Sequence, residues 1–253
     1  MINKSLVLFF VCFLLCLSCA TTQKSSLKMI SYKKNYVLTD KSGTFSLARE
    51  SGFDSSSRNY VTKYKIQDTN NQKILEKVIT FSEVKNLSKK VKVLSPVKSK
   101  YQVWFDGKVH QTTMTVNEKE GLLLVKMRSP EDQWNGEKRV PMVKGNGVRC
   151  FYSQVVECAY RIGFLQKAIK LKSGKMAFSL IWEGYPYIQE QYLNIKSEPV
   201  TQASLSYDGK NQVGEHRFSL NFGGNSVFYF VDKKFRLDRI FWPSQGLSVV
   251  SGK

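Results

Sequence analysis

Few residues of this sequence have the types and spacing that enzymatic chemistry requires. The chain has two histidines, His110 and His216, and it contains no Gly-x-Ser-x-Gly, His-Glu-x-x-His or phosphate-binding glycine loop. We expect both histidines to lie on strands and to face water. Glu183 and Glu190 could face each other across a hairpin, as the paired carboxylates of a hydrolase do. Nothing separates this pair from the other acidic residues, so the sequence predicts a protein with no catalytic residues.

The N-terminal segment predicts export. Lys4 is followed by an apolar run over residues 6 to 17, which is shorter than the roughly 20 residues of a membrane-spanning helix and is typical of a signal peptide. The sequence Ser18-Cys19-Ala20 resembles the end of bacterial lipoprotein signals, where the cysteine is acylated. This resemblance implies a signal over residues 1 to 18, a lipid anchor on Cys19 and, because alanine follows the cysteine, an outer-membrane location in the cell envelope. The alternative is a secretory signal cut after Ala20, which leaves a periplasmic or secreted protein.

Two cysteines of the chain body, Cys150 and Cys158, are candidates for a disulfide. An oxidising compartment favours such a bridge, which would stabilise the fold by about 2.5 kcal/mol. On one continuous helix the two residues would lie about 12 Å apart, too far for a bridge, so the bridge requires Cys150 to precede the helix. The alternative is a pair of buried thiols. No metal site or cofactor is expected, because no Cys-x-x-Cys occurs in the chain after the N-terminal signal and the histidines are distant.

Basic residues dominate the charge of the chain. Its 39 Lys and Arg against 20 Asp and Glu give a formal charge of +19, which favours contact with anionic lipid head groups or acidic envelope polymers. Nucleic acid is not an expected partner, because an exported chain rarely meets it. The densest cluster of candidate contacts is Lys85, Lys89, Lys90, Lys92, Lys98 and Lys100. The alternative is a solvated, non-specific basic surface.

The elements that position these residues are mostly strands. Residues 19 to 30 have the polar composition of a tether, and residues 31 to 253 predict a β-rich domain of short strands between turn signals. Asp106-Gly107 and Asp208-Gly209 predict hairpin turns, so neighbouring strands should be antiparallel. Pro96 marks a candidate domain boundary.

One helix interrupts the strands. Apolar residues recur at helical spacing from Phe151 to Ile169 and predict a helix over residues 153 to 171. The predicted fold is mainly β (α+β), a twisted antiparallel meander or half-barrel with one amphipathic helix packed against it.

A late segment adds a resemblance to a known group. Val227 to Leu237, with Asp232 between two apolar runs, is followed by Ile240 and Trp242. It resembles the strand, charged turn and strand of bacterial lipoprotein carriers and related envelope proteins, over about residues 100 to 250. The resemblance implies a half-barrel with an apolar cavity that could hold an acyl chain. The aromatic residues that could line it are Trp104, Phe105, Trp182, Phe228, Phe230 and Trp242. The alternative for all six is an ordinary core position.

The sequence therefore predicts a non-enzymatic envelope lipoprotein whose curved sheet binds an apolar ligand, such as an acyl chain, or a partner protein such as another lipoprotein. A second prediction is a structural or adhesive surface protein whose basic face binds anionic lipid or polymer. A hydrolase is the third.

Overall fold

The computed structural model describes residues 29–88, 91–142, 147–188, 195 and 198–252. Cys19, Lys89, Lys90 and Glu190 lie outside these residues, as does the predicted signal. Among the helices of the described part, none is both long and apolar enough to cross a membrane.

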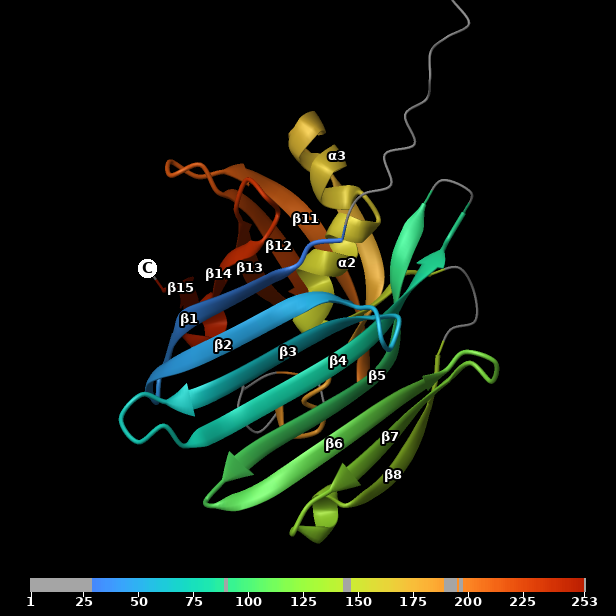
Figure 1. Cartoon of the computed structure of the whole chain (residues 1–253), viewed down its shortest axis with the longest axis vertical. Helices are drawn as coiled ribbons and strands as arrows, with labels where there is room; N and C mark the ends of the chain where they lie inside the picture. The colour runs from blue at the N-terminus through green and yellow to red at the C-terminus, as the bar shows by residue number, and fades with distance from the viewer. Residues whose placement is uncertain (1–28, 89–90, 143–146, 189–194, 196–197, 253) are drawn as a thin grey trace, which may run out of the picture.

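Fifteen strands form one sheet (Figure 1). In chain order they are β1 (Tyr32–Asp40), β2 (Gly43–Asp54), β3 (Asn59–Asp68), β4 (Ile74–Asn86), β5 (Lys92–Phe105), β6 (Lys108–Asn117), β7 (Leu122–Arg128), β8 (Gly136–Pro141), β9 (Arg149–Phe151), β10 (Lys175–Ile181), β11 (Val200–Lys210), β12 (His216–Phe222), β13 (Asn225–Val231), β14 (Leu237–Trp242) and β15 (Leu247–Ser251). Short 3-10 helices occur at η1 (Asp132–Trp134), η2 (Tyr152–Gln154) and η3 (Pro243–Gln245).

The strands follow a meander order, except that the first strand pairs with the last. Strands β8 back to β1 are followed by β15 back to β9, so β1 pairs with β15 in the middle of the sheet. The predicted antiparallel arrangement is confirmed for every pair except β9 and β10, which are parallel and make the sheet mixed.

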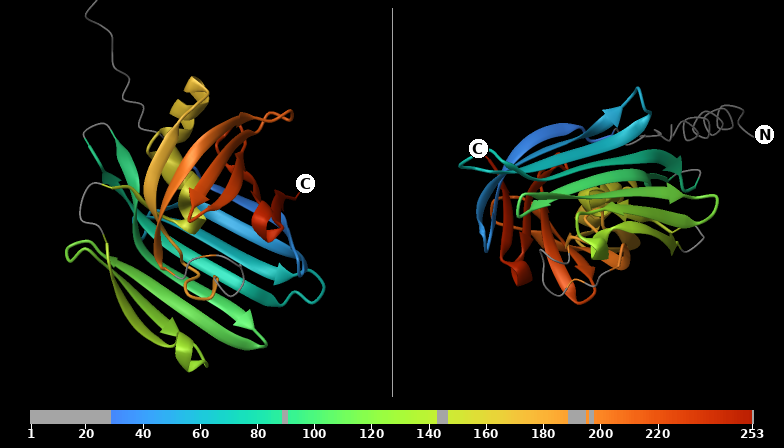
Figure 2. Two further views of the ribbon diagram at one scale, coloured as in Figure 1. Left: turned by 180° about the vertical axis from the view of Figure 1, so that it is seen from behind. Right: turned by 90° about the horizontal axis from the view of Figure 1, so that it is seen from below.

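Strong curvature brings distant strands together. The edge strand β9 contacts β5, and β6, β7 and β8 extend past this contact (Figure 2). Met114 of β6 and Leu123 and Val125 of β7 still belong to the core. The sheet is curved without being a closed barrel. Pro96, the candidate boundary, lies inside β5 opposite Ser82 of β4.

Two of the predicted turns have different outcomes. Asp106 and Gly107 form the β5–β6 turn with φ values of 47° and 77°, as a two-residue turn with left-handed residues requires, and this prediction is confirmed. The prediction for Asp208-Gly209 is wrong. This pair lies within β11 at a shift of register, because Gly209, at φ 117°, takes up a bulge, and the chain turns after Lys210 instead.

The predicted helix is present but is divided in two. It forms α2 (Val155–Arg161) and α3 (Phe164–Leu171), which lie on the concave side of the sheet (Figure 1). Gly163 between them has φ 83°, a left-handed conformation that ends α2 and starts a new helix. The helices and the sheet share one core, which includes Tyr36, Leu94, Phe151, Leu165, Leu220 and Trp242.

Both cysteines are free thiols, and the disulfide prediction is wrong. The side chains of Cys150, on β9, and Cys158, on α2, are both buried in the same core. Burial and a hydrogen bond with Cys150 raise the pKa of Cys158 well above its usual value. Both side chains therefore pack as small core residues, and at Cys158 the thiolate, the form that reacts, is disfavoured.

The strand, charged turn and strand at residues 227 to 242 form as the sequence predicts. β13 and β14 flank the turn, and the Asp232 carboxylate accepts hydrogen bonds from the backbone N–H groups of Lys234 (2.8 Å) and Arg236 (3.0 Å). A carboxylate that satisfies the turn in this way explains why an aspartate stands at its first position.

Candidate anion-binding groove

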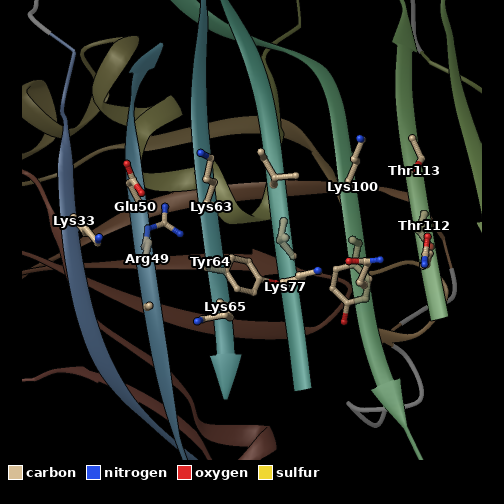
Figure 3. Close-up of a pocket in the computed structure, with 16 residues that line it drawn as sticks. Lys33, Arg49, Glu50, Lys63, Tyr64, Lys65, Lys77, Lys100, Thr112 and Thr113 are labelled. Atoms are coloured by element: carbon tan, nitrogen blue, oxygen red, sulfur yellow. The ribbon is translucent and has the colours of Figure 1, made fainter. Parts of the chain in front are cut away.

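A groove lies on the outer face of the sheet, across β1 to β6. Figure 3 shows its side chains rising from the strands, with the helices behind the sheet. Its volume is about 670 Å³, within the range of roughly 300 to 1,000 Å³ that ligand pockets occupy.

Two rows of cross-strand partners build this groove. The first row runs from β1 to β6 through Lys33, Glu50, Lys63, Ile79, Lys100 and Thr113. The second row runs from β2 to β6 through Ala48, Lys65, Lys77, Gln102 and Gln111. Directly opposed residues share one face of a sheet, so both rows present their side chains to the same surface.

The electrostatics of the groove are one-sided. Five lysines and one glutamate line its outer surface, which leaves a net charge of +4 (five minus one). Lys65 and Lys77 lie directly opposite each other on β3 and β4, and like charges in this position destabilise a sheet. Within the described ranges none of the five ammonium groups forms an ion pair. The groove is therefore a concentration of uncompensated positive charge.

Beneath the groove, on the inner face, Arg49 is already neutralised. Its guanidinium forms an ion pair with Glu157 at 2.8 Å and donates hydrogen bonds to the hydroxyl of Tyr32 and the carbonyl of Ser153. Both members of the pair are buried, and breaking such a pair costs about 3–5 kcal/mol. Arg49 thus holds α2 against β2 and is unavailable to a ligand in the groove.

Glu183, one of the two predicted hydrolase carboxylates, binds the backbone at the start of η2. It is buried and accepts hydrogen bonds from the backbone N–H groups of Tyr152 and Ser153, both at 3.0 Å. Burial raises the pKa of Glu183 to about 7. The carboxyl group caps the start of η2, where unpaired N–H groups need an acceptor.

A small cavity lies between the sheet and α2. Its volume is about 90 Å³, below the range of roughly 300 to 1,000 Å³ for ligand pockets. It is lined by apolar side chains, including Leu47, Ile66 and Val155, and by polar groups of Arg49 and Glu76.

The six aromatic residues predicted to line an acyl cavity are dispersed over the fold. Trp182 and Trp242 are fully buried and both contact the ring of Phe222. Phe105 contacts the His110 ring, with centroids 5.3 Å apart. The other three contact cationic side chains, namely Trp104 with Lys77, Phe228 with Arg217 and Phe230 with Arg239. They do not meet around one cavity.

The predicted lysine cluster contributes little to the groove. Lys100 lies in it, and Lys98 is on the same face of β5, whereas Lys85 forms ion pairs with Glu83 and Glu118. Lys92 is exposed at the start of β5. The groove lysines that were not predicted are Lys33, Lys63, Lys65 and Lys77. Their signal in the sequence is alternation, since lysines at positions 63 and 65 interleave with the inward residues Tyr60, Thr62, Tyr64 and Ile66.

His110 does not face water, and that prediction is wrong. It is 0% exposed and lies among the rings of Phe105, Trp134 and Tyr187, because β6 turns this residue inward. Burial lowers its pKa. His216 is partly exposed and shares a hydrogen bond with the Tyr207 hydroxyl at 3.1 Å. No group of three or more metal-ligating side chains occurs in the described part of the chain.

Comparisons with known proteins identify a similar fold and no family. No family model matches the chain, and no curated protein matches it. A solved structure, the β-barrel-like protein of domain of unknown function DUF1849 from Brucella abortus, is similar with a TM-score of 0.51. The likeness covers 90% of this chain and 98% of that one at 10% sequence identity. At this identity it establishes a β-barrel-like fold alone.

Proposed function

We propose that this protein is a non-enzymatic binding protein whose outer sheet face holds an anionic ligand. The observation that carries the proposal is the groove itself, where five lysines surround one glutamate and Lys65 directly opposes Lys77. Apposed like charges cost free energy in the empty protein. A bound anion relieves that repulsion, so the arrangement favours binding over fold stability.

The predicted export signal and the predicted acyl anchor on Cys19 support a location of the groove in the cell envelope. In the cell envelope, anionic lipid head groups and acidic polymers are the abundant anions, and a chain held at the outer membrane meets both. A single surface lysine contributes about 1 kcal/mol near an anionic surface. Binding of useful strength therefore needs several lysines in one place, which this face provides.

The apolar-ligand version of the prediction has weaker support. A cavity of about 90 Å³ would have to enlarge before it could hold an acyl chain, and the six candidate aromatic residues are dispersed. The outer groove needs no such rearrangement, because its volume is already about 670 Å³.

The test uses a compact polyanion, sucrose octasulfate, titrated calorimetrically into the mature protein. We expect the double variant Lys65→Gln/Lys77→Gln to bind it at least fivefold more weakly than the wild type, since two close charges are lost. The matched control is Lys233→Gln/Lys234→Gln, which removes two exposed charges from the β13–β14 turn. Equal binding by wild type, groove variant and control would contradict the proposal.

A further inference from the structure

We infer that the groove is the central part of a longer track and that its ligand is a linear acidic polysaccharide with widely spaced charges. This inference rests on the proposed function and names its ligand class. It comes from the part of the first row that lies beyond the groove.

The first row continues across the rest of the layer. Thr113 of β6 is paired with Lys126 of β7, and Lys126 is paired with Glu137 of β8. Lys126 also forms an ion pair with Glu137 at 2.7 Å, but both side chains are well exposed, and an exposed pair of this kind is weak enough for a ligand carboxylate to replace Glu137. The cations of the extended row are therefore Lys33, Lys63, Lys100 and Lys126, on β1, β3, β5 and β7. A lysine stands on every second strand, and the residues between them are one acidic residue, Glu50, and two uncharged ones, Ile79 and Thr113.

This alternation sets the spacing of the charges. Adjacent strands lie about 4.8 Å apart, so cations on every second strand recur about every 10 Å, and the track from β1 to β7 is about 29 Å long. The second row runs parallel at about 7 Å along the strands. It adds Lys65 and Lys77 near the centre and Arg128 at the β7 end, where Arg128 is paired with Gln111.

A single lipid head group or small anion could meet only part of such a track. A linear chain lying across the strands meets all four cations in turn, as the left-to-right course of Lys33, Lys63 and Lys100 in Figure 3 illustrates. A nucleic acid strand, with a phosphate about every 3.4 Å of helix axis, carries far more charge than these lysines match. A flat bilayer would rest on the rim of the groove and leave its floor unfilled.

The neutral residues between the cations favour a sugar chain. Gln102, Gln111 and Thr113 line the groove between its charged positions, and their amide and hydroxyl groups both donate and accept hydrogen bonds. Sparse acid groups separated by many hydroxyl groups are the chemistry of an acidic polysaccharide with one carboxylate per disaccharide.

The first experiment is a length series. Hyaluronan oligosaccharides with two, three, four and six carboxylates are titrated into the mature protein by calorimetry. Each added carboxylate should tighten binding roughly two- to fivefold, the effect of one exposed ion pair, until four are present, and only slightly thereafter. Affinity that is independent of length, or that keeps rising at the same rate beyond four charges, overturns the inference.

Variants at the two ends of the track provide the second experiment. Lys33→Gln/Lys126→Gln should weaken the four-carboxylate oligosaccharide at least fourfold and leave the two-carboxylate one unchanged, because the central lysines remain. The control, Lys41→Gln/Lys119→Gln, removes two exposed charges from the β1–β2 and β6–β7 turns and should change neither. An equal loss in both variants overturns the inference.

A third arm separates the ligand classes. Groove-dependent sedimentation with vesicles of 30% anionic lipid, combined with length-independent oligosaccharide binding, assigns the face to a membrane and overturns the polysaccharide inference. Sucrose octasulfate binding that depends on Lys65 and Lys77 would still support the proposed function in that case. If sucrose octasulfate binding does not depend on Lys65 and Lys77, both the proposed function and the polysaccharide inference are overturned.

Discussion

Glu183 shows how a perturbed carboxyl group can serve structure instead of catalysis. Sequence reasoning paired it with Glu190 as a hydrolase candidate, and its raised pKa fits that expectation in isolation. Its partners are the backbone N–H groups at the start of η2, and it lines neither the groove nor the interior cavity. The raised pKa therefore has its origin in burial at a helix cap.

This burial predicts a pH-dependent stability. The pKa of Glu183 is about 7 in the folded protein and about 4.3 in an unfolded chain, so between these values the folded state binds more protons. The free energy of unfolding should fall as pH rises from about 4.5 to 7, by about 3 kcal/mol for this group, and level off above pH 7. Urea unfolding at half-unit pH steps measures the slope.

The comparison that isolates this group is Glu183→Gln, which keeps a carbonyl acceptor and cannot ionise. Its stability should lack the fall between pH 4.5 and 7, while the contribution of His110, whose pKa is lowered by burial and whose sign is opposite, stays in both proteins. If the free energy of unfolding depends on pH in the same way in the wild type and the variant, this explanation is wrong.

The helical segment illustrates how far local pattern predicts an element. The apolar spacing from Phe151 to Ile169 continues across Gly163, so the sequence predicts one helix where the chain forms two. The side chains beyond the break still face the core, and for this reason the periodicity gives no warning of it. The left-handed backbone at Gly163 is visible only in the folded chain.

Replacing this glycine tests its conformational role. Gly163→Ala should lower the free energy of unfolding by about 1–2 kcal/mol, since a Cβ disfavours the left-handed conformation at φ 83°. Gly147→Ala, where an added Cβ meets nothing within 4 Å, should change it by less than about 0.5 kcal/mol. Chemical denaturation of both variants gives the comparison, and equal effects would contradict the role assigned to Gly163.

The groove could be predicted in part from its strands. Alternation identifies which lysines of β3 point outward, and the two-residue turn at Asp106-Gly107 fixes the pairing of Lys100 with Thr113 by counting. Counting fails elsewhere, because the register shifts between Ile66 and Gln67 in β3 and between Phe81 and Ser82 in β4. The first shift decides that Lys77 faces Lys65, and the second changes the pairing of β4 with β5; no local signal indicates either.

The complete sheet depends on contacts between distant parts of the chain. The pairing of β1 with β15, the parallel pair of β9 with β10 and the approach of β9 to β5 link residues that are remote in sequence. Curved β architecture with a packed helix follows from composition and turn signals, and that prediction is confirmed. The three long-range contacts depend on curvature, which sequence patterns do not specify.

The central position of β15 predicts a large effect of its removal. A chain that ends at residue 246 loses pairing along both β1 and β14 and loses the buried side chains of Leu247 and Val249. We expect it to lose the single cooperative unfolding transition of the full-length protein. Circular dichroism during urea titration measures this. A chain that ends at Ser251 is the control, and a cooperative transition in both would contradict the prediction.

The place of β1 has a mechanical consequence. β1 is hydrogen-bonded to β2 on one side and to β15 on the other. The two edge strands of the sheet are β8 and β9. If the chain is tethered through its N-terminus, tension enters the domain on an interior strand. A pull along β1 then has to shear two ladders at once, while the same pull on an edge strand would peel one bond after another.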